Sequence, residues 1–279
     1  MELINIPCFG VAGNFTGHLE QAGEDKDFVN LKTKEVNAPK GIFPTYIPGA
    51  PSKNKTPDFL SVFPFNPEKI IFPKGESKLQ IESECALIFN VEWKDDLIID
   101  LIPISFGASN DCSIRKEGAK KISEKKNWGK ASKGFSSNQI KITSFDEASV
   151  INDYRIASFL VRDNKVYEYG QDSRVKDYSY IYLKLKDWLI EKFNFQSDEG
   201  PLENIHEYLL EAGRPSSLMV SIGATRYTAW GETNFLQDKD KALVILYPES
   251  KYSKDDILEM VLKGDFNKDI SALIQTVEI

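Results

Sequence analysis

Cysteine is scarce in this 279-residue sequence: Cys8, Cys85 and Cys112 lie far apart, without a CxxC spacing. They are therefore expected to be reduced thiols of a cytosolic protein. No apolar stretch approaches the roughly 18 residues that a membrane span needs. The amino terminus also lacks the charged segment followed by a long apolar segment that is typical of a secretion signal. These absences predict a cytoplasmic protein that does not enter a membrane.

Positive charge is in deficit, since 35 Lys and Arg stand against 42 Asp and Glu, a net charge of −7. This balance argues against a general nucleic-acid binder or a protein of anionic membrane surfaces. The exception is one basic run, which consists of Arg115, Lys116, Lys120, Lys121, Lys125, Lys126, Lys130 and Lys133. A nucleic-acid site is the competing interpretation of this run. Because the chain as a whole is acidic, we expect instead that most of these side chains are solvated.

Strand patterns dominate the middle of the chain. They cover residues 78–93, 138–145, 156–170, 216–225 and 241–248, and the third is a hairpin with its turn near Asp163-Asn164. Helical patterns are fewer, and they cover residues 178–193, 201–213 and 253–264. The last has Ser253 as its N-cap and Gly264 as its C-terminal stop. The pattern predicts a strand-rich α+β fold.

Eight of the thirteen prolines fall in residues 37–74. This density excludes a long helix and predicts an ordered, turning segment with short edge strands. We expect one domain over residues 1–279. Residues 1–74 would form its amino-terminal lobe and Pro-rich connection, and residues 75–279 its metal-binding catalytic core.

Two glutamates, Glu82 and Glu84, stand at the start of the apolar run that ends near Trp93. Side chains two apart on a strand share a face and lie about 6.5–7 Å apart at the backbone. Apolar residues continue both faces of this strand, so both carboxylates are expected to point into protein. Burying them unpaired would cost several kcal/mol each, so positive charge should meet them. A divalent cation with oxygen ligands is one answer and a cluster of Lys or Arg is the other. An exposed edge with solvated glutamates is the remaining alternative.

Four separated segments resemble the motifs of the fumarylacetoacetate hydrolase family, in the family's order. They are Gly13-Asn14-Phe15-Thr16-Gly17-His18, Glu82-Ser83-Glu84, Asn110-Asp111-Cys112-Ser113-Ile114-Arg115, and Trp128-Gly129-Lys130 with Phe135. The stretch Gly213–Thr228 is also similar to the family's strand that leads into a GT turn, which indicates Thr225. The resemblance implies a mixed β-roll with short peripheral helices, and a homodimer.

The resemblance also implies the site. Glu82, Glu84 and Asp111 would hold Mg²⁺, or alternatively Mn²⁺ or Ca²⁺, and three carboxylates without clustered His or Cys suit such a hard cation. Lys130 would lie beside the metal and stabilise a developing enolate oxygen, whereas Lys125 and Lys126 would not contribute. The expected substrate is a small 2-oxo acid or β-diketo acid. Its binding residues would be Asn14, Phe15, Arg115 and Thr225.

The resemblance implies that His18 is a catalytic base, although a lone histidine is more often structural. A nearby helix N-terminus would keep its imidazole neutral and able to take a proton. The family often places a glutamate three residues later, where this chain has Gln21. We expect the Gln21 amide to reach the ring from a short helix over residues 17–23, with Thr16 as a possible cap. An amide cannot stabilise an imidazolium as a carboxylate does, so hydrolysis should be slow and Gln21→Glu should increase it.

The resulting functional prediction is a metal-dependent enzyme, with C–C bond hydrolysis as the first choice. Decarboxylation or keto–enol isomerisation is close behind, and a catalytically silent homologue that binds a metal and a ligand is the alternative from another class. Lys116 stands where members of the family usually carry Asp, and Gly118 where some carry Gln. The substrate is therefore expected to differ from fumarylacetoacetate.

Overall fold

The computed structural model describes residues 2–28, 33–49, 55–116 and 118–279. A first sheet consists of β1 (Cys8–Ala12), β2 (Gly41–Tyr46), β5 (Ser83–Lys94), β6 (Leu97–Asn110), β8 (Gly134–Phe135), β9 (Ile140–Lys141) and β12 (Ser217–Ala224). A second consists of β3 (Lys69–Ile71), β10 (Tyr154–Arg162), β11 (Lys165–Arg174), β13 (Lys241–Pro248) and β14 (Ser271–Glu278). Two short strands, β4 (Leu79–Gln80) and β7 (Ser113–Ile114), pair with each other.

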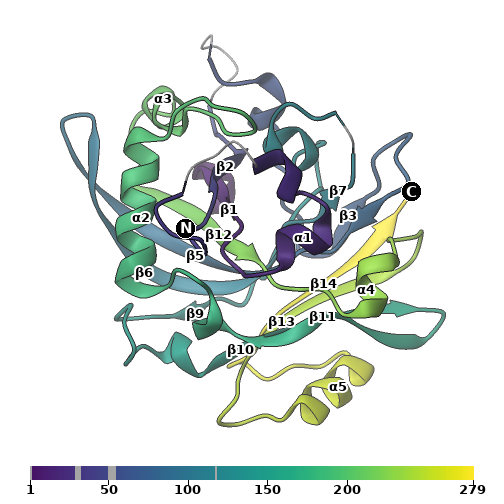
Figure 1. Ribbon diagram of the computed structural model, residues 1–279. Helices are drawn as coiled ribbons and strands as arrows, with labels where there is room; N and C mark the ends of the chain where they lie inside the picture. Colours follow the sequence, from purple (N-terminus) through teal and green to yellow (C-terminus); the bar gives the residue numbers. More distant parts are fainter. Residues whose placement is uncertain (1, 29–32, 50–54, 117) are drawn as a thin grey trace.

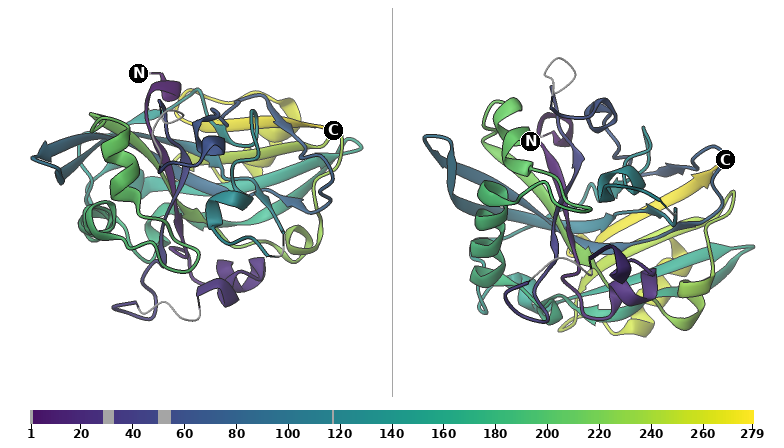
Figure 2. Two further views of the ribbon diagram at one scale, coloured as in Figure 1. Left: turned by 90° about the horizontal axis from the view of Figure 1, so that it is seen from above. Right: turned by 45° about the horizontal axis from the view of Figure 1, so that its top comes forward.

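The first sheet has the order β2-β1-β12-β5-β6-β8, with β9 also paired to β6, and the second has the order β11-β10-β13-β14-β3 (Figure 1). In the first sheet β1 is parallel to β12, although the two strands, purple and green in Figure 2, lie far apart in the sequence. Residues before 75 therefore contribute strands to both sheets. The two sheets share one hydrophobic core, in which Leu87 and Phe106 of the first meet Ile156, Val244 and Leu273 of the second.

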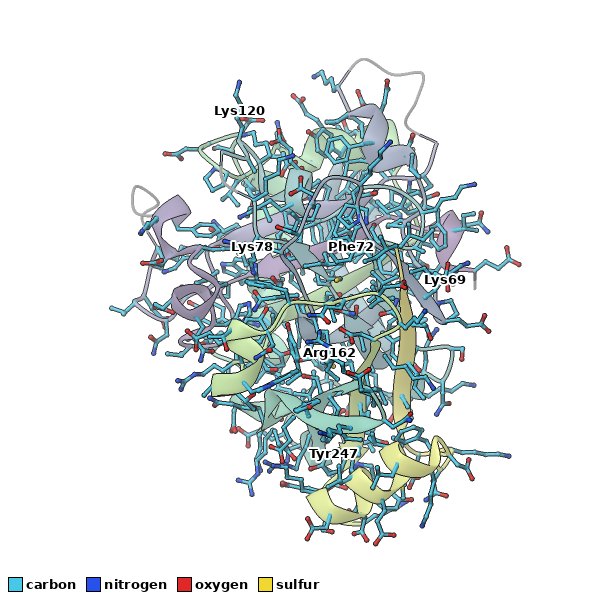
Figure 3. All side chains as sticks on the ribbon, turned by 90° about the vertical axis from the view of Figure 1, so that its right-hand side faces the viewer. Lys69, Phe72, Lys78, Lys120, Arg162 and Tyr247 are labelled. Atoms are coloured by element: carbon cyan, nitrogen blue, oxygen red, sulfur yellow. The ribbon has the colours of Figure 1, made fainter. Side chains whose placement is uncertain are left out.

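Short helices lie around the sheets: α1 (His18–Ala22), α2 (Tyr182–Phe195), α3 (Ile205–Glu211), α4 (Ala229–Thr233) and α5 (Lys254–Lys263). Phe193 of α2 packs edge-on against Phe9 of β1, with ring centroids 5.0 Å apart. Ile257 and Val261 of α5 join a second apolar cluster with Tyr247 of β13, and Tyr247 is labelled near this helix in Figure 3. Within the described residues, no helix combines the length and the apolar character that crossing a membrane requires.

The predicted strand-rich α+β class is confirmed. The hairpin of β10 and β11 turns at Asp163-Asn164, where both residues have positive φ. Helix α5 begins with a capping box at Ser253 and ends at Gly264, in the left-handed conformation.

Several predicted bounds are wrong. Helix α2 begins at Tyr182, four residues later than its apolar stripe suggests, and α3 begins after Asn204, whose side chain caps it. Within the strand predicted over 138–145, only Ile140–Lys141 forms a strand. The Pro-rich segment supplies β2 and β3, while its residues 50–54 lie outside the described part of the chain.

Candidate functional site

Strand pairing brings together the three carboxylates that the sequence predicts as metal ligands. Strands β5 and β6 are antiparallel, with Glu84 opposite Ser109. Just beyond this pair, the Asp111 N–H donates to the Glu82 carbonyl at 3.0 Å, and the Asn110 side chain accepts from the Glu82 N–H at 3.1 Å. One oxygen each from Glu82, Glu84 and Asp111 lies within 4.8 Å of the others, and all three residues are buried.

A bulge in β12 supplies the neutral partner of Glu84. The register of β12 on β5 shifts between Ser221 and Ala224, and Gly223 there has φ +121°, a value that favours glycine. The Gly223 N–H donates to Glu84 Oε2 at 2.8 Å. Burial, together with the charge of Asp111, raises the pKa of Glu84 well above its usual value. Without a bound cation, this environment favours the neutral form of Glu84.

Glu82 and Asp111, in contrast, are paired with buried cations. Lys126 Nζ lies 2.6 Å from Glu82 Oε2 and 2.7 Å from Asp111 Oδ2. Arg115 Nη2 lies 2.8 Å from Glu82 Oε1, and Lys133 Nζ lies 3.0 Å from Asp111 Oδ1. Burial alone would raise the pKa of Glu82, but Lys126 and Arg115 hold that pKa well below its usual value. Of the two answers that the sequence leaves open, the Lys and Arg cluster is present in the structure.

A second layer of charge surrounds Arg115. Its guanidinium contacts Glu24 Oε1 at 2.9 Å, Gln80 Oε1 at 2.7 Å and the Tyr227 hydroxyl at 2.6 Å. Lys125 Nζ lies 3.0 Å from the same Glu24 oxygen. The predicted substrate residue Arg115 therefore already has protein partners. Glu24 reaches Arg115 because Gly23, in the left-handed conformation, turns the chain after α1.

Lys130 does not take the position predicted for it. Its side chain is exposed, and among the described residues no ion pair joins it to the three carboxylates. The buried lysines at the triad are Lys126 and Lys133, and Lys133 also donates to the Cys112 carbonyl. The prediction was wrong because this segment has no regular period from which to read a side chain's direction. In the described part of this segment, helical structure is limited to η4 (Ile122–Lys125).

His18 lies at the start of α1, where a short helix was predicted, and it is buried, but its partner is not Gln21. The Gln21 side chain accepts from the Tyr227 N–H at 2.9 Å and donates to the Tyr227 carbonyl and to Glu232 Oε2, both at 3.3 Å. Among the residues that the structure describes, His18 Nδ1 finds no hydrogen-bond partner. The predicted contact between the amide and the ring is therefore wrong, and so is the Thr16 cap, since the N-cap is Gly17. Burial lowers the pKa of His18, so the ring is held neutral.

The other residues predicted to bind substrate have structural partners. Both N–H groups of the Asn14 amide are used, for the Tyr180 and Ile222 carbonyls, and its oxygen accepts from the Tyr180 N–H. Thr225 is buried and bonds Ser83 Oγ at 2.8 Å. Phe15 is half-buried and packs edge-on against Tyr178. Asn14 and Thr225 therefore fix the loops around the triad.

Two cavities adjoin the site. The inner one, about 20 Å³, is lined in part by His18, Glu82, Glu84, Lys126 and Phe43, and it holds no more than about one water. The outer one, about 460 Å³, is lined in part by Arg115, Lys116, Lys125 and Lys78, which is labelled in Figure 3. Glu24 lines both. A ligand larger than a water therefore fits the outer cavity as it stands, and the inner one only after side chains move.

The triad itself could hold a hard cation. Two oxygens on opposite sides of an ion bound at 2.0–2.6 Å are about 4–5 Å apart, which matches the 4.8 Å limit of this cluster. Glu82 Oε1 and Asp111 Oδ2 are buried, and each faces a cation, Arg115 at 2.8 Å and Lys126 at 2.7 Å. The donor set therefore fits Mg²⁺ or a similar ion, in competition with Lys126.

The segment that carries Lys126 is held in place at η4 by another buried carboxyl group, that of Glu203. Glu203 accepts a hydrogen bond from the Ser123 hydroxyl, and the Ile122 N–H donates to the Pro201 carbonyl. Burial raises the pKa of Glu203 to about 7. In the unfolded chain its pKa is about 4.3. The folded state therefore binds this proton more tightly, and the stability linked to it is present at low pH and lost as pH rises toward 7.

Glu203→Gln should remove this pH dependence. Between pH 5 and pH 8 the parent should lose roughly 1–3 kcal/mol more of its free energy of unfolding than the variant does. Urea denaturation of both proteins at the two pH values measures the difference. Parallel loss in parent and variant would show that Glu203 is ionised in the folded state at both pH values.

Comparison with other proteins places the chain in a family without assigned activity. The chain belongs to a family of unknown function, DUF5718, whose model matches residues 24–277. Among curated protein sequences none matches it.

Solved structures show the same fold at low identity. One is a 2-keto-3-deoxy-D-arabinonate dehydratase complexed with magnesium and 2,5-dioxopentanoate, 15% identical, with a TM-score of 0.54, covering 98% of this chain and 72% of that one. A second is a 5-carboxymethyl-2-hydroxymuconate delta-isomerase from Mycobacterium smegmatis, 14% identical, with a TM-score of 0.53, covering 99% and 80%. A third is a 2-hydroxyhepta-2,4-diene-1,7-dioate isomerase from Mycobacterium marinum, 12% identical, with a TM-score of 0.53, covering 99% and 75%. At these identities the likeness establishes the fold alone.

Proposed function

We propose that the protein is an enzyme that acts on a small 2-oxo acid or β-diketo acid at the buried triad. The observation that carries this proposal is the convergence of Glu82, Glu84 and Asp111 beside Lys126 and Lys133. Carboxylates and ammonium groups in a water-poor site can hold an anionic substrate and respond strongly to charge that develops on it. The magnesium-bound dehydratase and the two isomerases that share the fold support the choice of substrate class.

Each side chain has a role that follows from its surroundings. Glu82, Glu84 and Asp111 would be the ligands of Mg²⁺, with Mn²⁺ or Ca²⁺ as alternatives, and the bound ion would polarise the oxygens of the oxo acid. The Lys133 ammonium, held by Asp111, is placed to stabilise negative charge on an enolate oxygen. Neutral His18, with Nδ1 unpaired, can take a proton from the substrate.

Proton transfer at an enolisable carbon is favoured over the C–C hydrolysis that was our first expectation. Hydrolysis needs a base that activates water, and the described residues offer His18 no hydrogen-bonded carboxylate to stabilise its charged form. Isomerisation, dehydration or decarboxylation needs less from that base. Hydrolysis of an acylpyruvate remains the alternative within the same substrate class.

The wider setting follows the same resemblance. The chain is a divergent relative of the fumarylacetoacetate hydrolase family, forms a homodimer, and works in the cytoplasm without nucleic-acid or membrane partners. Residues 75–279 supply the metal-binding core of its single domain.

One observation favours a second candidate, a catalytically silent protein that binds a ligand only in the outer cavity. The inner cavity of about 20 Å³ is too small for an oxo acid as it stands. Binding of a substrate analogue such as oxalate without turnover of any oxo acid would favour this candidate over the enzyme.

The enzyme proposal predicts metal-dependent turnover of a panel of small 2-oxo and 1,3-dicarbonyl acids. Glu84→Ala should lower kcat by at least about 100-fold, because it removes one ligand of the ion. Lys130→Met changes an exposed side chain and should retain parent activity. The measurements are the loss of enol absorbance and product analysis by NMR, each with Mg²⁺ and with excess chelator. Turnover that is equal with and without Mg²⁺, or equal in Glu84→Ala and the parent, would contradict the metal role.

A further inference from the structure

The position between Glu82 and Asp111 is already taken by a side chain of the protein. Lys126 Nζ lies within 2.7 Å of one oxygen of each carboxylate, so a single ammonium bridges two of the three candidate ligands. Its side chain is 3% exposed, so solvent scarcely competes for it. A divalent ion shared by the same two oxygens would need this space.

The chain around Lys126 holds the ammonium in place. The Lys126 N–H donates to the Ser123 carbonyl at 3.0 Å, and the next side chain, Asn127, donates to the Thr45 and Val62 carbonyls at 2.9 and 3.0 Å. The ammonium also lies 5.2 Å from the centre of the Phe43 ring, within cation–π range. These contacts therefore fix the Lys126 side chain in the site.

The side chains around the triad already carry at least as much positive charge as negative charge. Even with Glu84 ionised, the four carboxylates Glu24, Glu82, Glu84 and Asp111 do no more than match four cationic side chains, Arg115, Lys125, Lys126 and Lys133. A divalent ion that entered while all four cations stayed would leave an excess of two positive charges in a buried site, which is unfavourable. An anionic oxo acid that entered with the ion, or a lysine that left, would reduce this excess.

We propose that Lys126 is a tethered cation that occupies the metal position of the substrate-free protein, so that a divalent ion binds only when Lys126 moves aside. The inference rests on the proposed function for the identity of the metal ligands. It goes further by making the empty enzyme a weak metal binder, in which ion and anionic substrate strengthen each other's binding. Such mutual strengthening is reciprocal by thermodynamic linkage.

The test measures metal binding without substrate or turnover. The full chain is stripped with chelator, and Mn²⁺ binding is followed by electron paramagnetic resonance and calorimetry in the parent, Lys126→Met, Lys126→Gln and Lys125→Met. Both substitutions of Lys126 should bind Mn²⁺ at least about 10-fold more tightly than the parent, because the competing ammonium is gone. Two different neutral side chains are used so that a folding defect in one leaves the other to report.

Lys125→Met is the matched control, since it removes a neighbouring buried charge that pairs with Glu24 instead of the triad. It should gain much less affinity than either Lys126 variant. An equal gain in Lys125→Met would mean that net charge, and not occupancy of the position, sets the affinity, and would overturn the proposal. Tight binding to the substrate-free parent would overturn it as well. So would a folded Lys126 variant that binds no Mn²⁺.

The outcome is separable from that of the proposed function. A parent without turnover whose Lys126 variants gain Mn²⁺ affinity would contradict the activity and support the role of Lys126. A parent that turns over an oxo acid with Mg²⁺, and also binds Mn²⁺ tightly when substrate-free, would support the activity and contradict the role of Lys126.

Discussion

Glu82→Gln should lower the free energy of unfolding by about 3–5 kcal/mol in the presence of chelator. The substitution keeps the shape of the side chain but removes the charge that compensates Lys126 and Arg115, which lie 2.6 and 2.8 Å from its oxygens. Breaking a buried ion pair on one side leaves an uncompensated charge in a site with little solvent, and losses of this size are typical.

Glu84→Gln is the matched control, two residues further along the same buried segment. Glu84 has the Gly223 N–H as its hydrogen-bond donor, and its raised pKa favours the neutral form without a metal. An amide oxygen can accept the same hydrogen bond, so the change should cost less than about 1 kcal/mol.

Chemical denaturation of the parent and both variants at pH 7 measures the difference. Equal losses in the two variants would show that Glu84 is ionised and paired like Glu82. A small loss in Glu82→Gln would show that Lys126 and Arg115 find other partners when the carboxylate is gone.

The paired glutamates mark the part of the site that the sequence could predict. Alternation along residues 81–91 placed apolar residues on both faces of the strand, and the structure buries Cys85 and Leu87 in one cluster and Ala86 and Ile88 in another. Because both faces of the strand are buried, Glu82 and Glu84 require positive charge nearby. Period-two geometry needs only local sequence, so this inference could be made without a structure.

Which cations meet the glutamates could not be derived in the same way. Lys125, Lys126, Lys130 and Lys133 stand in one basic segment, and three of them are buried while Lys130 is exposed. The directions of these side chains depend on hydrogen bonds between the segment and distant residues. Ser123 donates to Glu203, and Asn127 donates to the carbonyls of Thr45 and Val62. No period of the sequence encodes such contacts.

The surroundings of His18 were mispredicted for a related reason. Helical spacing put Gln21 on the face of the ring, but the Gln21 amide is paired with the main chain of Tyr227, far along the sequence. Glu24 reaches the charged cluster because the chain reverses at Gly23. Because the backbone reverses after one turn of helix, helical spacing does not predict where the side chains after the reversal lie.

His18→Gln should lower kcat for the accepted oxo acid by about 10²–10⁴-fold, the usual contribution of a general base. The imidazole is buried beside Glu82 and Glu84, and burial holds its pKa below the ordinary value, so the base form is present at neutral pH. Parent activity should fall as pH drops through that lowered pKa and the ring becomes charged. The variant should lack this acid limb. His206→Gln, the same change at the other histidine of the chain, should leave both the rate and the pH profile as in the parent.

Gln21→Glu also tests the role of His18. The sequence predicted that this change increases hydrolysis, whereas the structure predicts no increase. A carboxylate at position 21 could not donate to the Tyr227 carbonyl and would lie next to Glu232, so it should lower stability without raising hydrolysis. Steady-state kinetics from pH 5 to pH 9 on the parent, His18→Gln, His206→Gln and Gln21→Glu measure both effects. An unchanged acid limb in His18→Gln would assign the base to another group. Faster hydrolysis in Gln21→Glu would mean that residue 21 turns toward the ring when substrate binds, as the spacing of the two residues first suggested.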